Sequence, residues 1–173
     1  MKLSKTLFFT LVILGGLLTA KIGVSARNAD NSSIFEFSSL ATVTPPFTGA
    51  TNAIRGVPGA GLPWTITDSV HGQLRANGKL EISITGLVLA DDPLVPANSR
   101  LTNPVPSFRA TVSCLSIDSN KLPTTVNVST DAFPASPAGD SEIETAVTLP
   151  SPCIAPIVFV TTPNGAWLAA TGH

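Results

Sequence analysis

Hydrophobic and polar residues alternate with a period of two along several short segments of this chain, which is typical of β-strands with one buried face. In segment 79–89, Leu80, Ile82 and Ile84 project to one side and polar residues to the other. The same alternation occurs in residues 64–70, 108–117, 124–133 and 141–149. Residues 157–161 are apolar on both faces, which predicts a central strand that is covered on each side.

Turn-forming residues separate these segments. Asn77-Gly78 lies between two alternating runs and predicts a type I′ hairpin, and Gly86 predicts a β-bulge. The Pro- and Gly-rich segment 44–61 predicts an extended surface connection. Eight to ten short strands at a spacing of about ten residues predict an all-β fold. We expect an antiparallel two-sheet β-sandwich, either Ig-like or jelly-roll-like, with an antiparallel β-barrel as the alternative.

The first 26 residues differ from the rest of the chain. Lys2 and Lys5 precede an uncharged apolar run over residues 7–20, which is shorter than the roughly 20 residues that a membrane-spanning helix needs. This pattern predicts a signal peptide that is cleaved after Ala26, with Ala20 as the second candidate and an uncleaved anchor as the alternative. The predicted organisation is a signal peptide (1–26), a polar Pro- and Thr-rich extension (27–52) and a β-sandwich domain (53–173).

Composition restricts the partners of the predicted mature chain, residues 27–173. Seven Lys and Arg residues face eleven Asp and Glu residues, which gives a net charge of −4. Because no basic cluster exists, we expect no binding to nucleic acid and none to a membrane after signal cleavage. The two cysteines, Cys114 and Cys153, are expected to form a disulfide in an oxidising compartment. We therefore predict a secreted or extracellular protein without a cofactor, which acts on an unknown extracellular or envelope partner.

Residues with catalytic or metal-binding chemistry are sparse. His71 follows Asp68 and Ser69 closely, whereas a catalytic triad is assembled from separate segments. The acidic residues lack the dense spacing of a calcium loop, and two His residues with two bonded Cys residues are too few for zinc. We predict no catalytic residue and no metal site. The expected function is a non-catalytic binding or structural module, and a small secreted hydrolase with an unrecognised active site is the alternative.

The longest predicted connection, residues 90–107, is the candidate ligand-binding loop. It is longer than most connections inside a compact domain, and four prolines restrict its freedom. Asp91 and Asp92 lie at one end and Arg100 lies in the middle. The candidate apolar anchors are Leu94, Val95 and Leu101.

Several short motifs resemble those of a group of exported bacterial β-rich proteins of unassigned function. The motifs are Gly61-Leu62-Pro63-Trp64, Gly86-Leu87-Val88-Leu89, Val112-Ser113-Cys114 and the Pro-rich run from Leu149 to Val160. The resemblance covers about residues 54–173. It implies export and a β-rich fold, and it implies no activity, ligand or functional residue.

Overall fold

The computed structural model describes residues 31–172, and this part of the chain is built from β-strands. The strands are β1 (Ser33–Phe37), β2 (Ala41–Thr42), β3 (Trp64–Ile66), β4 (Val70–Arg75), β5 (Lys79–Ile84), β6 (Leu87–Leu89), β7 (Ser107–Ile117), β8 (Pro123–Ser129), β9 (Phe133–Pro134), β10 (Ser141–Ala146), β11 (Ile154–Thr161) and β12 (Trp167–Ala170). The predicted signal peptide, residues 1–26, lies outside the described residues.

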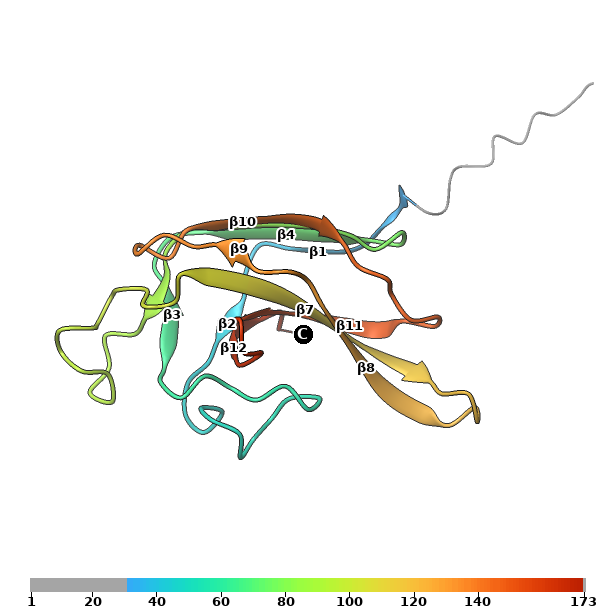
Figure 1. Cartoon of the computed structure of the whole chain (residues 1–173), viewed down its shortest axis with the longest axis horizontal. Coiled ribbons are helices and arrows are strands. Elements are labelled where there is room, and N and C mark those ends of the chain that lie inside the picture. The colour runs from blue at the N-terminus through green and yellow to red at the C-terminus, as the bar shows by residue number, and fades with distance from the viewer. Residues whose placement is uncertain (1–30, 173) are drawn as a thin grey trace, which may run out of the picture.

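Two antiparallel sheets lie one above the other (Figure 1). Sheet A has the strand order β1-β4-β5-β10, and sheet B has the order β2-β12-β11-β7-β8, with β9 paired to the start of β7. Strands β3 and β6 form a separate two-stranded ribbon. The sheets are not closed into a barrel, so the prediction of an all-β sandwich is confirmed in preference to the barrel.

The core lies between the two sheets, and the period-two pattern identifies most of it. Leu80, Ile82 and Ile84 of β5 are all at most 2% exposed, as the alternation predicts. In the other predicted strands Val112, Val147 and Phe159 are buried as well, whereas Ile157 is only half-buried.

The turn at Asn77-Gly78 differs from the predicted type I′ hairpin, and that prediction is wrong. Type I′ requires a positive φ at both central residues, but only Gly78 has one, at 84°. The Gly78 N–H donates to the Arg75 carbonyl at 2.9 Å, so the turn is centred one residue earlier and ends on a left-handed glycine. A Cβ at Gly78 would lie 1.9 Å from the Val147 carbonyl oxygen, which is why glycine is required here.

Gly86 marks a break between strands and not a bulge within one. Strand β5 ends at Ile84, and β6 pairs with β3 outside sheet A. Gly86 has a φ of 81°, and its carbonyl accepts a hydrogen bond from the Thr67 N–H at 2.9 Å. The chain therefore leaves sheet A at this glycine.

A disulfide joins Cys114 of β7 to Cys153, the residue before β11, with a Cα–Cα distance of 4.9 Å. The predicted pairing is confirmed. Cys114 directly precedes Leu115, and Cys153 directly precedes Ile154. Leu115 and Ile154 are cross-strand partners in the pairing of β7 with β11. The bond therefore links adjacent strands of the same sheet and does not cross the sandwich.

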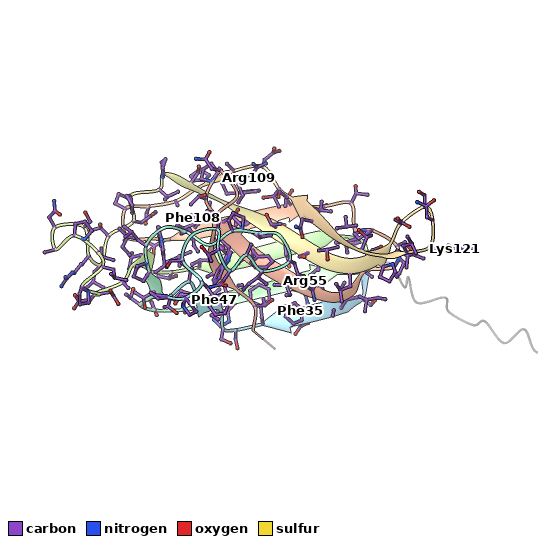
Figure 2. All side chains as sticks on the ribbon, turned by 90° about the horizontal axis from the view of Figure 1, so that it is seen from below. Phe35, Phe47, Arg55, Phe108, Arg109 and Lys121 are labelled. Carbon is purple, nitrogen blue, oxygen red and sulfur yellow. A yellow bond between two sulfur atoms is a disulfide. The ribbon has the colours of Figure 1, made fainter. Side chains whose placement is uncertain are left out.

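The connection 44–62, here called the covering segment, forms a third layer on the face of sheet B that points away from sheet A (Figures 1 and 2). The Ala60 N–H donates to the Trp167 carbonyl at 2.9 Å, and the Trp167 N–H donates to the Pro58 carbonyl at 2.8 Å. Val57 and Ala60 are each 6% exposed. Apolar side chains on this face of sheet B are thus covered by a segment that contains no regular strand.

The residues before the covering segment belong to the sandwich as well. Strand β1 pairs with β4 at one edge of sheet A, and β2 pairs with β12 at one edge of sheet B. Val43 is completely buried. Residues 33–43, which the sequence analysis assigned to the extension, therefore contribute an edge strand to each sheet.

Candidate functional site

The connection between β6 and β7, residues 90–106, projects from one end of the sandwich (Figure 1, the yellow-green loop). Two backbone hydrogen bonds close its neck. The Leu89 N–H donates to the Thr102 carbonyl at 3.0 Å, and the Leu101 N–H donates to the Leu89 carbonyl at 2.9 Å. The part beyond the neck, residues 90–101, is here called the projecting loop.

The three polar residues predicted as candidate ligand contacts, Asp91, Asp92 and Arg100, form interactions within the loop itself. Arg100 Nη1 lies 3.2 Å from Asp91 Oδ1 in a salt bridge, and Arg100 Nε donates to the Val95 carbonyl at 3.1 Å. Asp92 Oδ1 accepts the Leu94 N–H at 2.8 Å, which is a local turn motif of aspartate. The structure thus brings Asp91 and Arg100 together and directs Asp92 to its own backbone.

The three candidate apolar anchors of the loop have different environments. Val95 is 1% exposed and belongs to the core, whereas Leu94 is 59% exposed and Leu101 is 54% exposed. Because Arg100 bonds to Val95, the two segments that carry the exposed leucines are held to one another. Leu101 also has a positive φ of 54°, a conformation that costs a non-glycine residue about 1–3 kcal/mol.

Asn103 fixes the base of the loop, and the sequence analysis did not single it out. Its Nδ2 donates to the carbonyls of Val105 and Ser136, both at 2.8 Å, and its Oδ1 accepts the Val105 N–H at 2.8 Å. The residue is 8% exposed. The sequence signal that could have identified Asn103 is the dipeptide Asn103-Pro104, because Asn-Pro favours turn initiation. The loop is therefore anchored to the chain before β10.

A second candidate surface is the outer face of sheet A, which holds a shallow depression of about 700 Å³. The antiparallel register places side chains in rows across the strands. One row runs through Gln73, Glu81 and Glu144, with Glu36 of β1 opposite Gln73. Gln73 Nε2 donates to Glu36 Oε1 at 2.6 Å.

In the described part of the chain two cations pair with this row: Arg75, whose Nη2 lies 3.6 Å from Glu81 Oε2, and Lys79. Lys79 makes the closer contact. Its Nζ lies 2.6 Å from Glu81 Oε1 and 3.2 Å from Glu144 Oε1. The hydrogen bond that Lys79 donates to Glu81 lowers the pKa of Glu81, and this bond, with a second one that Lys79 donates to Glu144, raises the pKa of Lys79. Among residues 31–172, no group of three or more His, Cys, Asp or Glu side chains has an arrangement that could hold a metal ion.

The next row contains His71, Ser83 and Glu142 on three neighbouring strands. Ser83 Oγ donates to Glu142 Oε1 at 2.5 Å. In a hydrolytic triad the histidine lies between the hydroxyl and the carboxylate, whereas here the serine lies between the histidine and the glutamate. The row is also on an open sheet face, so this arrangement does not provide the enclosed, convergent groups that an active site needs.

No family model, curated protein sequence or solved structure matches this chain. In residues 31–172 no helix is long and apolar enough to cross a membrane.

Proposed function

We propose that this protein is an exported, non-catalytic binding module, and that the projecting loop, residues 90–101, is its contact surface. The observation that carries the proposal is the combination of internal bracing and apolar exposure. The salt bridge between Arg100 and Asp91 holds the loop, while Leu94 and Leu101 stay more than half exposed. A loop that is ordered before binding loses less conformational entropy when a partner binds.

The chemistry of the loop favours a partner with an apolar contact area. Two exposed leucines can fill shallow apolar pockets, and the Arg100–Asp91 pair between their segments can supply hydrogen bonds at the rim. Functional loops are commonly carried by a rigid scaffold, and here the neck is held to β6 and the base is held through Asn103. We therefore expect an extracellular or envelope protein as the partner.

Export is the second part of the proposal. The Cys114–Cys153 disulfide supports it, because disulfides persist in oxidising compartments and are rare in a reducing cytosol. The expected mature protein begins at Arg27. An intact-mass measurement of protein recovered outside the cytoplasm tests this expectation, and a mass that includes residues 1–26 contradicts the predicted cleavage.

The binding proposal is tested by capture of partners from the medium and envelope of the producing cells. The bait is the exported protein, and the test variant is Leu94→Ser with Leu101→Ser, which leaves the Arg100 contacts in place. Ile34→Ser is the matched control, since Ile34 is an exposed aliphatic residue of β1, at 43%. We expect the unchanged protein and the Ile34→Ser control to capture the same partner. The double variant should not capture it. Equal capture by all three baits, or no specific capture by any, contradicts the proposal.

A further inference from the structure

Strand β8 forms a free edge of sheet B. It pairs with β7 over seven successive positions without a register shift. Strand β9 pairs with β7 farther along, at Ser107 and Phe108, so among residues 31–172 no strand lies against the outer side of β8 (Figure 1). The edge is therefore long and regular, and its backbone is not paired with another strand. The covering segment contacts β8 through a side chain, since Asn127 Nδ2 donates to the Arg55 carbonyl at 3.0 Å.

The backbone of alternate β8 residues faces outward. The Thr130 N–H donates to the Ala110 carbonyl at 2.9 Å, and antiparallel pairing alternates between bonded and non-bonded positions. It follows that the even-numbered residues of β8 bond to β7. The backbone N–H and C=O groups of Thr125, Asn127 and Ser129 then point away from the sheet, as in any strand that can accept a further strand.

The other sheet edges carry features that discourage such pairing. Strand β1 has a register shift after Ser33 and carries Glu36, and β2 is only two residues long. Strand β10 carries Glu142 and Glu144. Short length, irregular register and charged side chains are the usual means of protecting an edge. Strand β8 has no charged residue, and its one proline is at its first position.

We propose that β8 binds β8 of a second copy of this chain, edge to edge and antiparallel, about a twofold axis at Val126. Residues 31–172 contain six Lys and Arg residues and ten Asp and Glu residues, a net charge of −4, so two copies repel one another over most of their surface. Strand β8 carries no carboxylate, so two copies can approach one another along this strand. A twofold interface of this kind also closes on itself and does not lead to fibres.

The charged residues nearest in sequence to the two ends of the strand favour this orientation. Lys121 lies two residues before β8, at the tip of the β7–β8 hairpin (Figure 2), and Asp131 lies two residues after β8. Both residues are exposed. Antiparallel pairing centred on Val126 places the Lys121 end of each copy against the Asp131 end of the other. Parallel pairing would instead place like charges together.

The β8 side chains on the face that points toward sheet A are also consistent with the antiparallel dimer. Thr124, Val126 and Val128 are only half-buried, although their partners on β7 are buried. In the twofold arrangement Val126 lies opposite Val126 of the second copy, and Val128 lies opposite Thr124. Each cross-strand pair covers apolar surface that the single copy leaves open to water.

Charge reversal tests the orientation independently of folding. Self-association of the exported protein is measured by sedimentation at increasing concentration, with the disulfide intact. Lys121→Glu alone and Asp131→Lys alone each place like charges at both ends of the interface, and we expect each to weaken the dimer about tenfold. The double variant, Lys121→Glu with Asp131→Lys, exchanges the charges and is expected to restore dimerisation. Failure of the double variant to restore it contradicts the twofold register.

Proline substitution tests the use of the edge itself. Thr125→Pro removes one outward N–H and leaves the hydrogen bonds to β7 in place, and Thr125→Val is the matched control because it keeps the N–H. We expect loss of the dimer with proline and retention with valine, with unchanged circular dichroism for both. A protein that stays monomeric up to about 1 mM overturns the proposal. A dimer that survives Thr125→Pro but is lost on substitution of the exposed Leu115, Ile117 and Ile154 also overturns it.

Discussion

The outer faces of the two sheets differ in what covers them, and their sequences differ accordingly. Sheet A is open on its outer face, and its strands carry Glu36, Glu81, Glu142 and Glu144. Sheet B lies between sheet A and the covering segment, and Arg109 is the one charged residue in its strands. The comparison shows that a strand alternates clearly when it is buried on one face only. In β11 and β12, which lie under the third layer, both faces are mostly apolar.

The largest expected effect comes from removing an apolar side chain on the covered outer face of sheet B. Phe159 is completely buried and its ring centroid lies 6.3 Å from that of Trp167. We expect Phe159→Ala to lower the free energy of unfolding by about 3–5 kcal/mol, since it leaves a cavity between sheet B and the covering segment. Denaturant unfolding of the disulfide-bonded protein measures the change.

The matched substitution on sheet A is Glu144→Ala. The Glu144 side chain is 73% exposed and forms only a surface contact with Lys79, so we expect a change within about 0.5 kcal/mol. Similar losses for Phe159→Ala and Glu144→Ala would contradict the proposed difference between the two outer faces.

This comparison also explains which parts of the fold could be predicted. The alternation at Leu80, Ile82 and Ile84 depends on strand geometry alone, so it gave the correct buried face. The apolar run at 157–161 correctly indicated a strand covered on both sides, since β11 lies between β12 and β7 and beneath the covering segment. What covers it could not be predicted, because residues 44–62 have no period and are held by contacts with the distant Trp167.

The candidate site was predictable in outline and not in detail. Length and proline content located the loop that starts after β6, but the sequence does not show that Val95 enters the core while Leu94 remains exposed. Arg100 and Asp91 meet through the folding of the loop. The anchor at Asn103 depends on the Ser136 carbonyl, which is 33 residues away. Such contacts are set by tertiary structure and leave no periodic pattern.

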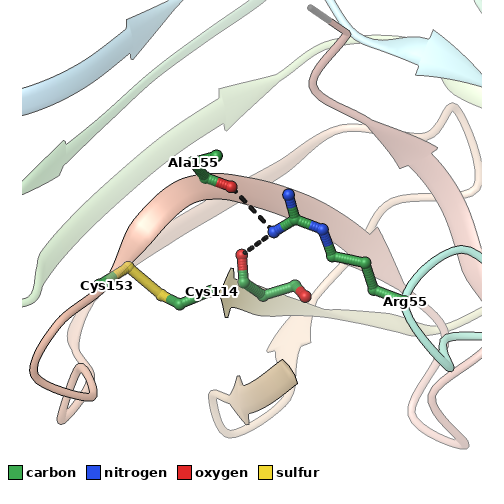
Figure 3. Close-up of a disulfide and its surroundings, with 5 residues drawn as sticks. Arg55, Cys114, Cys153 and Ala155 are labelled. Atoms are coloured by element: carbon green, nitrogen blue, oxygen red, sulfur yellow. Dashed lines mark hydrogen bonds between the residues drawn. A yellow bond between two sulfur atoms is a disulfide. The ribbon is translucent and has the colours of Figure 1, made fainter. Parts of the chain in front are cut away.

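A smaller effect is expected where the covering segment is fastened to sheet B by a polar side chain. Arg55 Nη1 donates to the carbonyls of Ser113 at 3.0 Å and Ala155 at 2.8 Å (Figure 3). Its positive φ of 50° is unfavourable for a residue with a side chain, so these bonds offset a local backbone cost. We expect Arg55→Met to lower the free energy of unfolding by about 1–2 kcal/mol.

Hydrogen exchange locates this effect. If Arg55 fastens the covering segment, the Val57 and Ala60 amides, which bond to Ile54 and Trp167, should exchange faster in Arg55→Met. Amides of β5 in sheet A should exchange at their former rates, because local opening leaves distant strands protected. Uniformly faster exchange across both sheets would show that Arg55 stabilises the whole domain and not this layer in particular.

The smallest expected effect is the pH dependence of the ion pair on the open face of sheet A. Hydrogen bonding to Lys79 lowers the pKa of Glu81 from its usual value of 4.5, and hydrogen bonding to Glu81 raises the pKa of Lys79 from its usual value of 10.5. Stability from the lowered carboxyl pKa is therefore present above pH 4.5 and is lost as the pH falls through the folded-state value. Stability from the raised amine pKa is present below pH 10.5 and is lost as the pH rises through its folded-state value. The difference in melting temperature between the protein and Lys79→Met should thus be constant between these limits and should shrink beyond each. It should also decrease with added salt, since both groups are exposed, and a difference that grows in acid would contradict the ion pair.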